Sequence, residues 1–530
     1  MPDMLTRLLE GLKGPLGKGL NPIRRGIERE ALRVDAQGCI AQTSHPEALG
    51  HKLTHPWITT DYAESLMELV TPVCDSAPEV LAFLSDLHRH VLHHLPEGEW
   101  LWPASMPARL PNGGDSVQIA DFGESHSGQL KHVYRKGLRH RYGSIMQSIA
   151  GIHYNFSLTP ELWNVLRALE GAENTPFDQY RTERYFHLIR QFRRNSWLLL
   201  YLFGSSVAVD DTFFADMPSS NPLIPHGKHT LLSEHATSLR MSDIGYQNSV
   251  QSQLKVCFNR LDSYIRTLKQ GIETPWPSYK RTGVKVDGEW QQISDHILQI
   301  ENEYYCDVRP KRVARRGQTQ LQALHDEGVE YIEVRCLDIN PHLPLGIDET
   351  QVRFLDTFLT WCLLSPGDWI SEEECHRLDD NRARVATGGR IPEGVLSIEG
   401  RMVTLSEQAT LLFDQLTTVA VCLDSGEEGD PHQQALMSLR NRLVNSALTA
   451  SGQAMATLME TGDDLTTVAM TLAQQHAAEL GAHPISSEMQ QQLEEKRIQS
   501  IADEHALVQH DQGSFDDYVA RYLASARHIS

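Results

Sequence analysis

The chain has 530 residues, of which 40% are hydrophobic and 22% charged. This composition is typical of a globular protein and excludes collagen-like and wholly disordered classes. At about 150 residues per domain, the length fits three to four domains or one large domain with additions. The net charge of −21 disfavours nucleic acid and anionic membranes as partners, so an anionic ligand requires a local basic patch.

The eight cysteines are scattered and form no Cys-x-x-Cys pair. They therefore indicate neither a zinc cage nor a dense disulfide framework, and a reducing, cytoplasmic compartment fits them best. Residues 1–20 lack the apolar core of a secretion signal. The most apolar stretch, residues 197–209, is shorter than the roughly 18 residues of a membrane span, and we interpret it as a buried core element.

The first predicted element is a strand over residues 23–34, where alternation places Glu28 and Glu30 on one face. Residues 57–70 fit either a helix or a turn that leads into a strand at 66–71, and periodicity does not decide between them. Apolar residues at helical spacing predict a helix over residues 78–94. Further helices are expected near residues 131–142 and 178–201, and the loop at 217–227 is long enough for a lid.

In the second half, strands are predicted over residues 297–305 and 329–339, joined by a basic loop at 309–317. A helix is expected over residues 349–364. Beyond Pro366 a Gly/Arg-rich connector near residues 386–401 leads into Ala-, Gln- and Glu-rich sequence that favours helices. We therefore divide the chain into a core, residues 1–370, and a mainly helical C-terminal region, residues 371–530, packed on it.

Polar residues two positions apart mark three of the predicted strands, and strand geometry puts both members of each pair on one face. Carboxylates gathered on a core face need cations, and Mg²⁺ takes oxygen ligands of this kind. One such pair is more often a half-exposed strand with salt bridges, but three pairs weaken that interpretation. The pairs are Glu28/Glu30, Glu301/Glu303 and Glu333/Arg335.

Mg²⁺ held by carboxylates is typical of phosphate chemistry. The basic loop suits a triphosphate, although a solvated surface loop is the alternative. Its charges are Arg309, Lys311, Arg312, Arg315 and Arg316. The stretch GLKGPLGKGL at 11–20 lacks the first Gly and the Ser/Thr of a Walker A loop, and no G-x-G-x-x-G, H-E-x-x-H or G-x-S-x-G string occurs. ATP would therefore bind by a metal-and-sheet route.

Long strings between residues 20 and 365 closely resemble, in order, motifs of the bacterial glutamate–cysteine ligases, also called γ-glutamylcysteine synthetases. Their length makes chance a poor explanation. They are RRGIEREALRV (24–34), THPWITTDYAESLMELVTP (54–72), YRKGLRHRYG (134–143), GIHYNFSL (151–158), ATSLRMSDIGY (236–246), QIENEYY (299–305), RPKRV (309–313) and EYIEVRCLDINP (330–341).

The resemblance implies an α+β fold related to glutamine synthetase: a curved, mainly antiparallel sheet forms a funnel, with helices outside and a helical C-terminal part. It makes residues 1–370 the catalytic core. The implied reaction is the ATP-dependent ligation of L-cysteine to the γ-carboxylate of L-glutamate through γ-glutamyl phosphate. The products are γ-glutamylcysteine, ADP and phosphate, the first step of glutathione biosynthesis.

The resemblance also implies roles for single residues. Arg335 matches the family's phosphoryl-clamping arginine, with Glu68 and Glu333 as its catalytic companions. His153 is the unusual metal ligand, since Mg²⁺ prefers oxygen and a lone His in an apolar stretch is more often a core residue. The implied Mg²⁺ ligands are Glu28, Glu30, Asp61, Glu68, His153 and Glu333.

For the acceptor cysteine the resemblance implies aromatic and apolar walls around the thiol and an arginine for the carboxylate. Position 62 is Tyr where close relatives have Phe, and Cys375 lacks the second cysteine of a bridge found in some relatives. The substrate-binding residues expected are Tyr62, Tyr134, Arg135, Leu138, Arg240 and Tyr246. The nucleotide-binding residues expected are Arg309, Lys311 and Arg312.

The expected ligands are small molecules: ATP, L-glutamate and L-cysteine, with Mg²⁺ as the ion and Mn²⁺ as the alternative. We expect a monomer, and the resemblance allows feedback inhibition by glutathione. Two other interpretations stay open. A carboxylate–amine ligase of the same fold would use a different amine, whereas a catalytically silent binding protein would have lost some of the metal-site carboxylates, and all are present.

Overall fold

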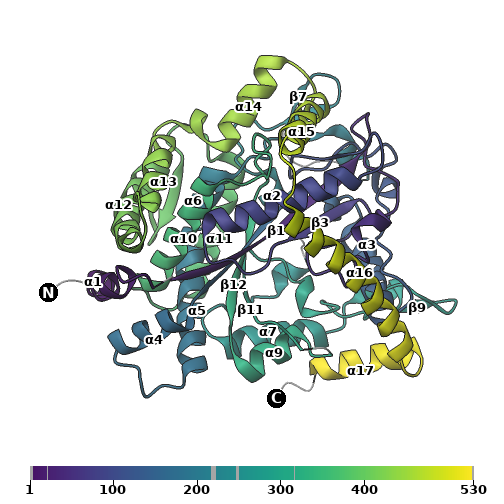
Figure 1. Ribbon diagram of the computed structural model, residues 1–530, viewed down its shortest axis with the longest axis horizontal. Coiled ribbons are helices and arrows are strands. Elements are labelled where there is room, and N and C mark those ends of the chain that lie inside the picture. The colour runs from purple at the N-terminus through teal and green to yellow at the C-terminus, as the bar shows by residue number, and fades with distance from the viewer. Residues whose placement is uncertain (1–3, 21, 217–222, 246–249, 316, 528–530) are drawn as a thin grey trace.

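The computed structural model describes residues 4–20, 22–216, 223–245, 250–315 and 317–527. Its centre is a seven-stranded antiparallel sheet in the order β11-β12-β5-β1-β3-β2, with β4 beside β1 (Figure 1). The strands are β1 (Ile23–Val34), β2 (Ile58–Thr60), β3 (Leu66–Val70), β4 (Trp100–Leu101), β5 (Ile152–Leu158), β11 (Val308–Lys311) and β12 (Tyr331–Leu337).

The register of the sheet gathers its polar residues. Glu30 of β1 lies opposite Glu68 of β3, and Glu28 of β1 lies opposite His153 of β5. On the other edge of β5, strand β12 pairs through Glu333. The predicted strand at 23–34 is confirmed, and residues 57–70, open between helix and strand, form β2 and β3. Because side chains alternate along each strand, one sheet face receives all these groups.

The opposite face of the sheet is anchored to a helix, α10 (Glu349–Leu364), by a buried polar cluster. The Tyr154 hydroxyl of β5 donates a 2.6 Å hydrogen bond to Asp356, and Arg25 of β1 lies 3.0 Å from the same carboxylate. Both Arg25 and Asp356 are almost fully buried. A buried ion pair fixes geometry because removing either partner leaves an uncompensated charge.

Helices surround the sheet (Figure 1), and all the predicted ones in the first 365 residues are confirmed. They are α2 (Ala77–His94), α3 (His126–Tyr142), α5 (Phe177–Asn195) with α6 (Trp197–Phe203), and α10. Every residue of α6 is buried, which confirms the interpretation of that apolar stretch. Five further helices were not predicted from the sequence: α1 (Met4–Leu16), α4 (Pro160–Leu169), α7 (Leu261–Glu273), α8 (Pro277–Thr282) and α9 (Gln320–Glu327).

The C-terminal region is helical, as expected, except for a hairpin in place of the predicted connector. The hairpin is β13 (Val395–Ile398) and β14 (Arg401–Thr404). The helices are α11 (Glu372–Gly388), α12 (Leu405–Leu423), α13 (Pro431–Arg440), α14 (Ala450–Thr461), α15 (Leu465–Gly481), α16 (Ser487–His510) and α17 (Phe515–Arg527). The α+β class with a mainly antiparallel sheet and a helical C-terminal region is confirmed. None of the described helices is long and apolar enough to cross a membrane.

Two small sheets complete the strands: β6 (Ala208–Asp210), β8 (Thr230–Leu232) and β7 (Ile224–His226) in one, and β9 (Lys285–Val286) with β10 (Glu289–Trp290) in the other. Part of the predicted lid is therefore the edge strand β7, whereas residues 217–222 lie outside the described residues.

The prediction of a strand over residues 297–305 is wrong, because this segment is irregular and contains one short 3₁₀ turn, Glu301–Glu303. The Glu303 carboxylate accepts hydrogen bonds from Tyr142 at 2.5 Å and Arg141 at 2.9 Å. The Glu301 carboxylate instead accepts the backbone N–H of Gln320 at 2.7 Å, where α9 begins. The two acidic groups anchor different neighbours, so their spacing reflects local capping and pairing and not a shared strand face.

The last two helices return to the front of the molecule and lie against α3 (Figure 1). Val519 of α17 packs with Leu130 and Val133 of α3 in a small apolar cluster. The backbone N–H of His126, at the first residue of α3, donates to Asp511 at 2.6 Å. The C-terminal region therefore supports the helix that carries the candidate acceptor residues.

Candidate active site

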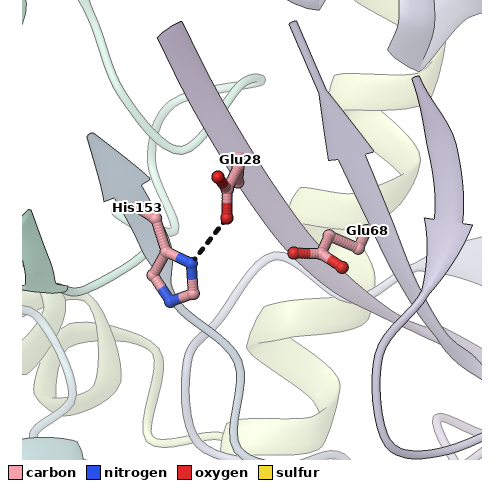
Figure 2. Close-up of side chains that lie close together, drawn as sticks. All are labelled: Glu28, Glu68 and His153. Carbon is pink, nitrogen blue, oxygen red and sulfur yellow. Dashed lines mark hydrogen bonds and ion pairs between the residues drawn. The ribbon is translucent and has the colours of Figure 1, made fainter. Parts of the chain in front are cut away.

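Three strands bring Glu28, Glu68 and His153 together on one face of the sheet, as Figure 2 shows. One ligand atom from each residue lies within 4.8 Å of the other two. His153 Nδ1 is 3.0 Å from Glu28, a hydrogen bond drawn as the dashed line in Figure 2. These three expected metal ligands therefore lie close together, although Glu28 and His153 are 125 residues apart in sequence.

His153 is the hub of a larger carboxylate cluster. Its Nε2 is 3.8 Å from Glu30, and its Nδ1 is 3.6 Å from Glu333. The side chains of Glu30 and Glu333 are only 6% and 1% exposed, so water does little to screen these charges. The structure therefore places carboxylates from β1, β3 and β12 around one imidazole.

Charge divides this cluster into two halves. Burial raises the pKa of Glu68 well above its usual value, and the charges of Glu28, Asp61 and Glu30 raise it further. Burial also raises the pKa of Glu30. Burial acts in the same direction on Glu333, but Lys311 and Arg335 outweigh it and lower the pKa of that carboxyl. The end near β3 is thus short of positive charge, whereas the end near β12 has its own cations.

Arg335 and Lys311 supply those cations. Arg335 Nη1 donates to Glu333 at 3.0 Å, and the Lys311 ammonium is 3.7 Å from the other oxygen of the same carboxylate. Both side chains keep some access to solvent, 23% and 17%. Because neither is sealed, each has room to meet an anionic ligand that enters over the sheet.

The rest of the basic segment has other partners. Arg309 lies on β11 and donates to the backbone carbonyls of Asn302 and Tyr304, at 3.2 and 2.7 Å. Arg312 donates to the carbonyl of Gly328 at 3.1 Å, and Arg315 pairs with Glu327 at 2.7 Å. Arg316 lies outside the described residues. Of the nucleotide-binding residues expected, the structure brings Lys311 to the carboxylates, whereas the contacts of Arg309 and Arg312 anchor neighbouring backbone.

Arg135 of α3, expected to bind the acceptor, contacts Asp61, an expected metal ligand. Below, the acceptor side means the expected acceptor-binding residues of α3, and the metal side means the carboxylate cluster around His153. Its Nε donates to the backbone carbonyl of Asp61 at 2.6 Å, and its Nη2 is 3.7 Å from the Asp61 carboxylate. Tyr62, next in the chain, is only 1% exposed, and its hydroxyl lies 3.1 Å from Ser144. Tyr134 and Leu138 also lie on α3; Tyr134 is half-buried and Leu138 is buried. Tyr246 lies outside the described residues.

Arg240 is buried, and its guanidinium has room only because residue 151 is a glycine. Its Nη2 donates to the carbonyl of Arg335 at 2.8 Å, and its Nη1 is 3.8 Å from Asp338. The guanidinium lies against Gly151, where an added Cβ would overlap it. The Gly151 N–H also donates to Glu30 at 2.6 Å, so one backbone position holds both groups.

We therefore expect Gly151→Ala to reduce kcat/KM for L-glutamate by at least about tenfold, because the methyl group displaces Arg240 and disturbs Glu30. Steady-state kinetics with circular dichroism as a fold check would measure this. Gly481→Ala is the matched control, since nothing lies within 4 Å of the Cβ it adds. Unchanged kinetics in Gly151→Ala would show that Arg240 tolerates the shift.

Sequence reasoning missed two polar residues beside the cluster. Asn155 donates to Glu28 at 2.9 Å, and its own buried carbonyl oxygen has no hydrogen-bond partner within the described structure. Asn155 follows His153 by two positions on β5, so strand alternation could have predicted that both side chains lie on the same face. Lys131 faces Asp61 and Glu68 from α3. The sequence could have indicated this residue, because it lies four positions before Arg135 on a predicted helix.

The residues of the cluster fit Mg²⁺. Their donor atoms are mainly carboxylate oxygens, which hard divalent cations prefer. The buried Glu333 Oε2 has no hydrogen-bond donor among the described residues, and at Glu68 burial and the charges of neighbouring carboxylates outweigh the charge of Lys131. Buried carboxylates of this kind are stabilised when they coordinate a metal.

The chain is similar in sequence to a known protein family. A family model described as glutamate-cysteine ligase matches residues 12–385. The glutamate–cysteine ligases of Hahella chejuensis and Pseudomonas aeruginosa are each 45% identical, over 527 and 526 residues, and each alignment covers 99% of both chains.

Two crystal structures have similar folds. A glutamate–cysteine ligase from Francisella tularensis in complex with AMP has a TM-score of 0.89 at 32% identity and covers 96% of this chain and 99% of its own. A bifunctional glutathione synthetase from Pasteurella multocida has a TM-score of 0.70 at 25% identity and covers 90% of this chain and 55% of its own. The chain belongs to the glutamate–cysteine ligase family.

Proposed function

We propose that the protein catalyses the ATP-dependent ligation of L-cysteine to the γ-carboxylate of L-glutamate, giving γ-glutamylcysteine, ADP and phosphate. The observation that carries the proposal is the carboxylate cluster around His153, flanked by Arg335 and Lys311 on the same sheet. Family membership over the full length supports the reaction class. The complex of the Francisella relative with AMP supports an adenine nucleotide as the co-substrate.

The proposed ligands of Mg²⁺ are Glu28, Glu30, Asp61, Glu68, His153 and Glu333. An ion held by these residues would neutralise phosphate charge and so favour transfer of the terminal phosphoryl group. Arg335 then meets the negative charge that develops on the transferring group, and Glu333 orients the Arg335 guanidinium through their 3.0 Å contact. Lys311 adds a second positive charge on the nucleotide side. Mn²⁺ is the alternative ion, since it accepts the same oxygen ligands.

The second step joins the amine to γ-glutamyl phosphate. The α3 residues Tyr134, Arg135 and Leu138 form the proposed acceptor side, and Arg240 lies against Gly151 and the Arg335 carbonyl. The combination of Tyr62, Tyr134 and Arg135 favours a small amino-acid acceptor, because aromatic walls suit a short side chain and an arginine suits a carboxylate. A different small amine is the alternative acceptor, since carboxylate–amine ligases of one fold share the metal site and differ mainly in the acceptor pocket.

ADP release by the purified protein tests the proposal, with MgATP and L-glutamate and either L-cysteine, L-2-aminobutyrate or other amines. Mass spectrometry identifies the product. Turnover that requires L-cysteine and gives γ-glutamylcysteine would support the proposal. Turnover with another amine alone would keep the sheet site and replace the acceptor, whereas no turnover with any amine would favour a silent binding protein.

Residues 1–370 contain every proposed reacting group, so we propose that they form the catalytic core and that residues 371–530 support it. The monomeric state, the cytoplasmic location and feedback inhibition by glutathione are further proposals. The cysteines support the location, because all eight are free thiols and a reducing compartment maintains that state. Size-exclusion chromatography and inhibition assays with glutathione test the other two.

A further inference from the structure

Lys131 lies one helical turn before Arg135 on α3, so both side chains leave the helix on the same face. The Lys131 ammonium is 5.1 Å and the Arg135 guanidinium 4.5 Å from the centre of the same Phe122 ring. The charges of Asp61 and Glu68 act on Lys131 from the metal side, and that of Arg135 acts on it from α3. Lys131 therefore sits where the acceptor side meets the carboxylate cluster.

Arg135 has few donors left for a ligand. Its Nε and Nη1 are engaged by the backbone carbonyls of Asp61 at 2.6 Å and Lys131 at 3.0 Å. Its Nη2 faces the Asp61 carboxylate at 3.7 Å. Arg135 is also 8% exposed, so most of its guanidinium is fixed within the protein. Its main contribution is to hold the loop at Asp61 in place.

Lys131 shows the opposite pattern. Its side chain is exposed, and within the described structure no carboxylate lies within 4.0 Å of its ammonium and no hydrogen bond uses it. Neighbouring protein atoms reduce the hydration of the ammonium, and together with the charge of Arg135 they lower its pKa to about 8. A cation with three unused donors beside a cluster of carboxylates offers an incoming carboxylate a place where it is attracted and not repelled.

We propose that Lys131 binds the α-carboxylate of the acceptor amino acid and so restricts the enzyme to acceptors with a free carboxylate. This inference rests on the proposed ligase function and adds a specificity residue to it. An amino-acid acceptor brings a negative charge towards the carboxylates of Glu28, Glu30, Asp61 and Glu68, and Lys131 is placed to offset that repulsion. Arg135 supplies the positioned loop and a second, more distant positive charge.

The test compares Lys131→Met and Lys131→Arg with wild type in ADP release. The acceptors are L-2-aminobutyrate and its neutral amide, L-2-aminobutyramide. We expect Lys131→Met to raise KM for L-2-aminobutyrate at least about tenfold, the effect of one charge-assisted hydrogen bond. The preference for the acid over the amide should shrink by the same factor. KM for ATP and for L-glutamate should change less than about twofold, and Lys131→Arg should restore most of the affinity.

Lys136→Met is the matched control, because it removes a second lysine of α3 that has no contact with Asp61 or Glu68 among the described interactions. An equal loss with acid and amide, or a rise in KM for L-glutamate, would overturn the role of Lys131 and leave the ligase function intact. Absence of turnover by the wild-type protein with any amino acid would overturn the proposed function and this inference together.

Discussion

Glu68→Gln should lower kcat by at least about 100-fold while leaving the fold intact, since it removes a negative oxygen from the proposed metal cluster. The change keeps the shape of the side chain and removes only its charge. Steady-state turnover with MgATP, L-glutamate and L-cysteine measures the effect. Glu161→Gln, on an exposed carboxylate of α4, is the control and should match wild type. Near-normal turnover in Glu68→Gln would exclude Glu68 from the metal site.

The same substitution should stabilise the metal-free protein. Because the folded state raises the pKa of Glu68 above its ordinary value of 4.5, the folded protein binds this proton more tightly than the unfolded chain. Stability is therefore lost as pH rises from 4.5 towards the raised pKa of Glu68 in the folded protein. In EDTA at pH 7 we expect a higher Tm for Glu68→Gln than for wild type, with a gap that narrows as pH falls towards 4.5.

Mg²⁺ should reverse this order, because a ligand that binds only the folded state stabilises it by mass action. Differential scanning fluorimetry with and without Mg²⁺ should show a rise in Tm for wild type and a much smaller rise for Glu68→Gln. An equal rise in both proteins would place the ion elsewhere. On this proposal a metal ligand lowers the stability of the protein when no metal is bound, a common trade-off between function and stability.

The parts of this site that the sequence could predict are those fixed by strand alternation. Glu28 and Glu30 share a face because side chains two residues apart on a strand always do, and Glu333 with Arg335 follows the same rule. That rule failed at Glu301 and Glu303, where the chain leaves the sheet. Their neighbours Arg141 and Gln320 are 162 and 19 residues distant in sequence, so tertiary contacts and not local pattern decided the outcome.

Contacts between distant segments account for the other differences. The support of α3 by Val519 and Asp511 joins segments almost 400 residues apart, and no local pattern signals it. Arg312 belongs to a run of positive charge that suits a phosphate, yet its guanidinium reaches the carbonyl of Gly328. Charge density in sequence shows that a ligand is electrostatically possible, but only the fold decides which side chains reach it.

Arg335→Lys should lose about 100-fold in kcat although it keeps the positive charge. The Arg335 guanidinium donates to Glu333 through Nη1 and still has planar donors for two oxygens of a phosphoryl group. A lysine ammonium at this position can satisfy Glu333 or the phosphoryl group but lacks the fork that spans both. KM for L-glutamate and L-cysteine should change little, because the missing interaction forms chiefly with the transferring group.

Arg24→Lys is the control, since Arg24 lies on β1 but pairs with Asp75 at the surface, 3.6 Å away. It should retain wild-type kcat and KM. A decisive extra readout is the partial reaction without amine, because Arg335 acts on phosphoryl transfer and not on attack by the acceptor. If Arg335→Lys forms γ-glutamyl phosphate at the wild-type rate but fails with cysteine, then Arg335 serves the second step, and the cation at the phosphoryl group must be Lys311.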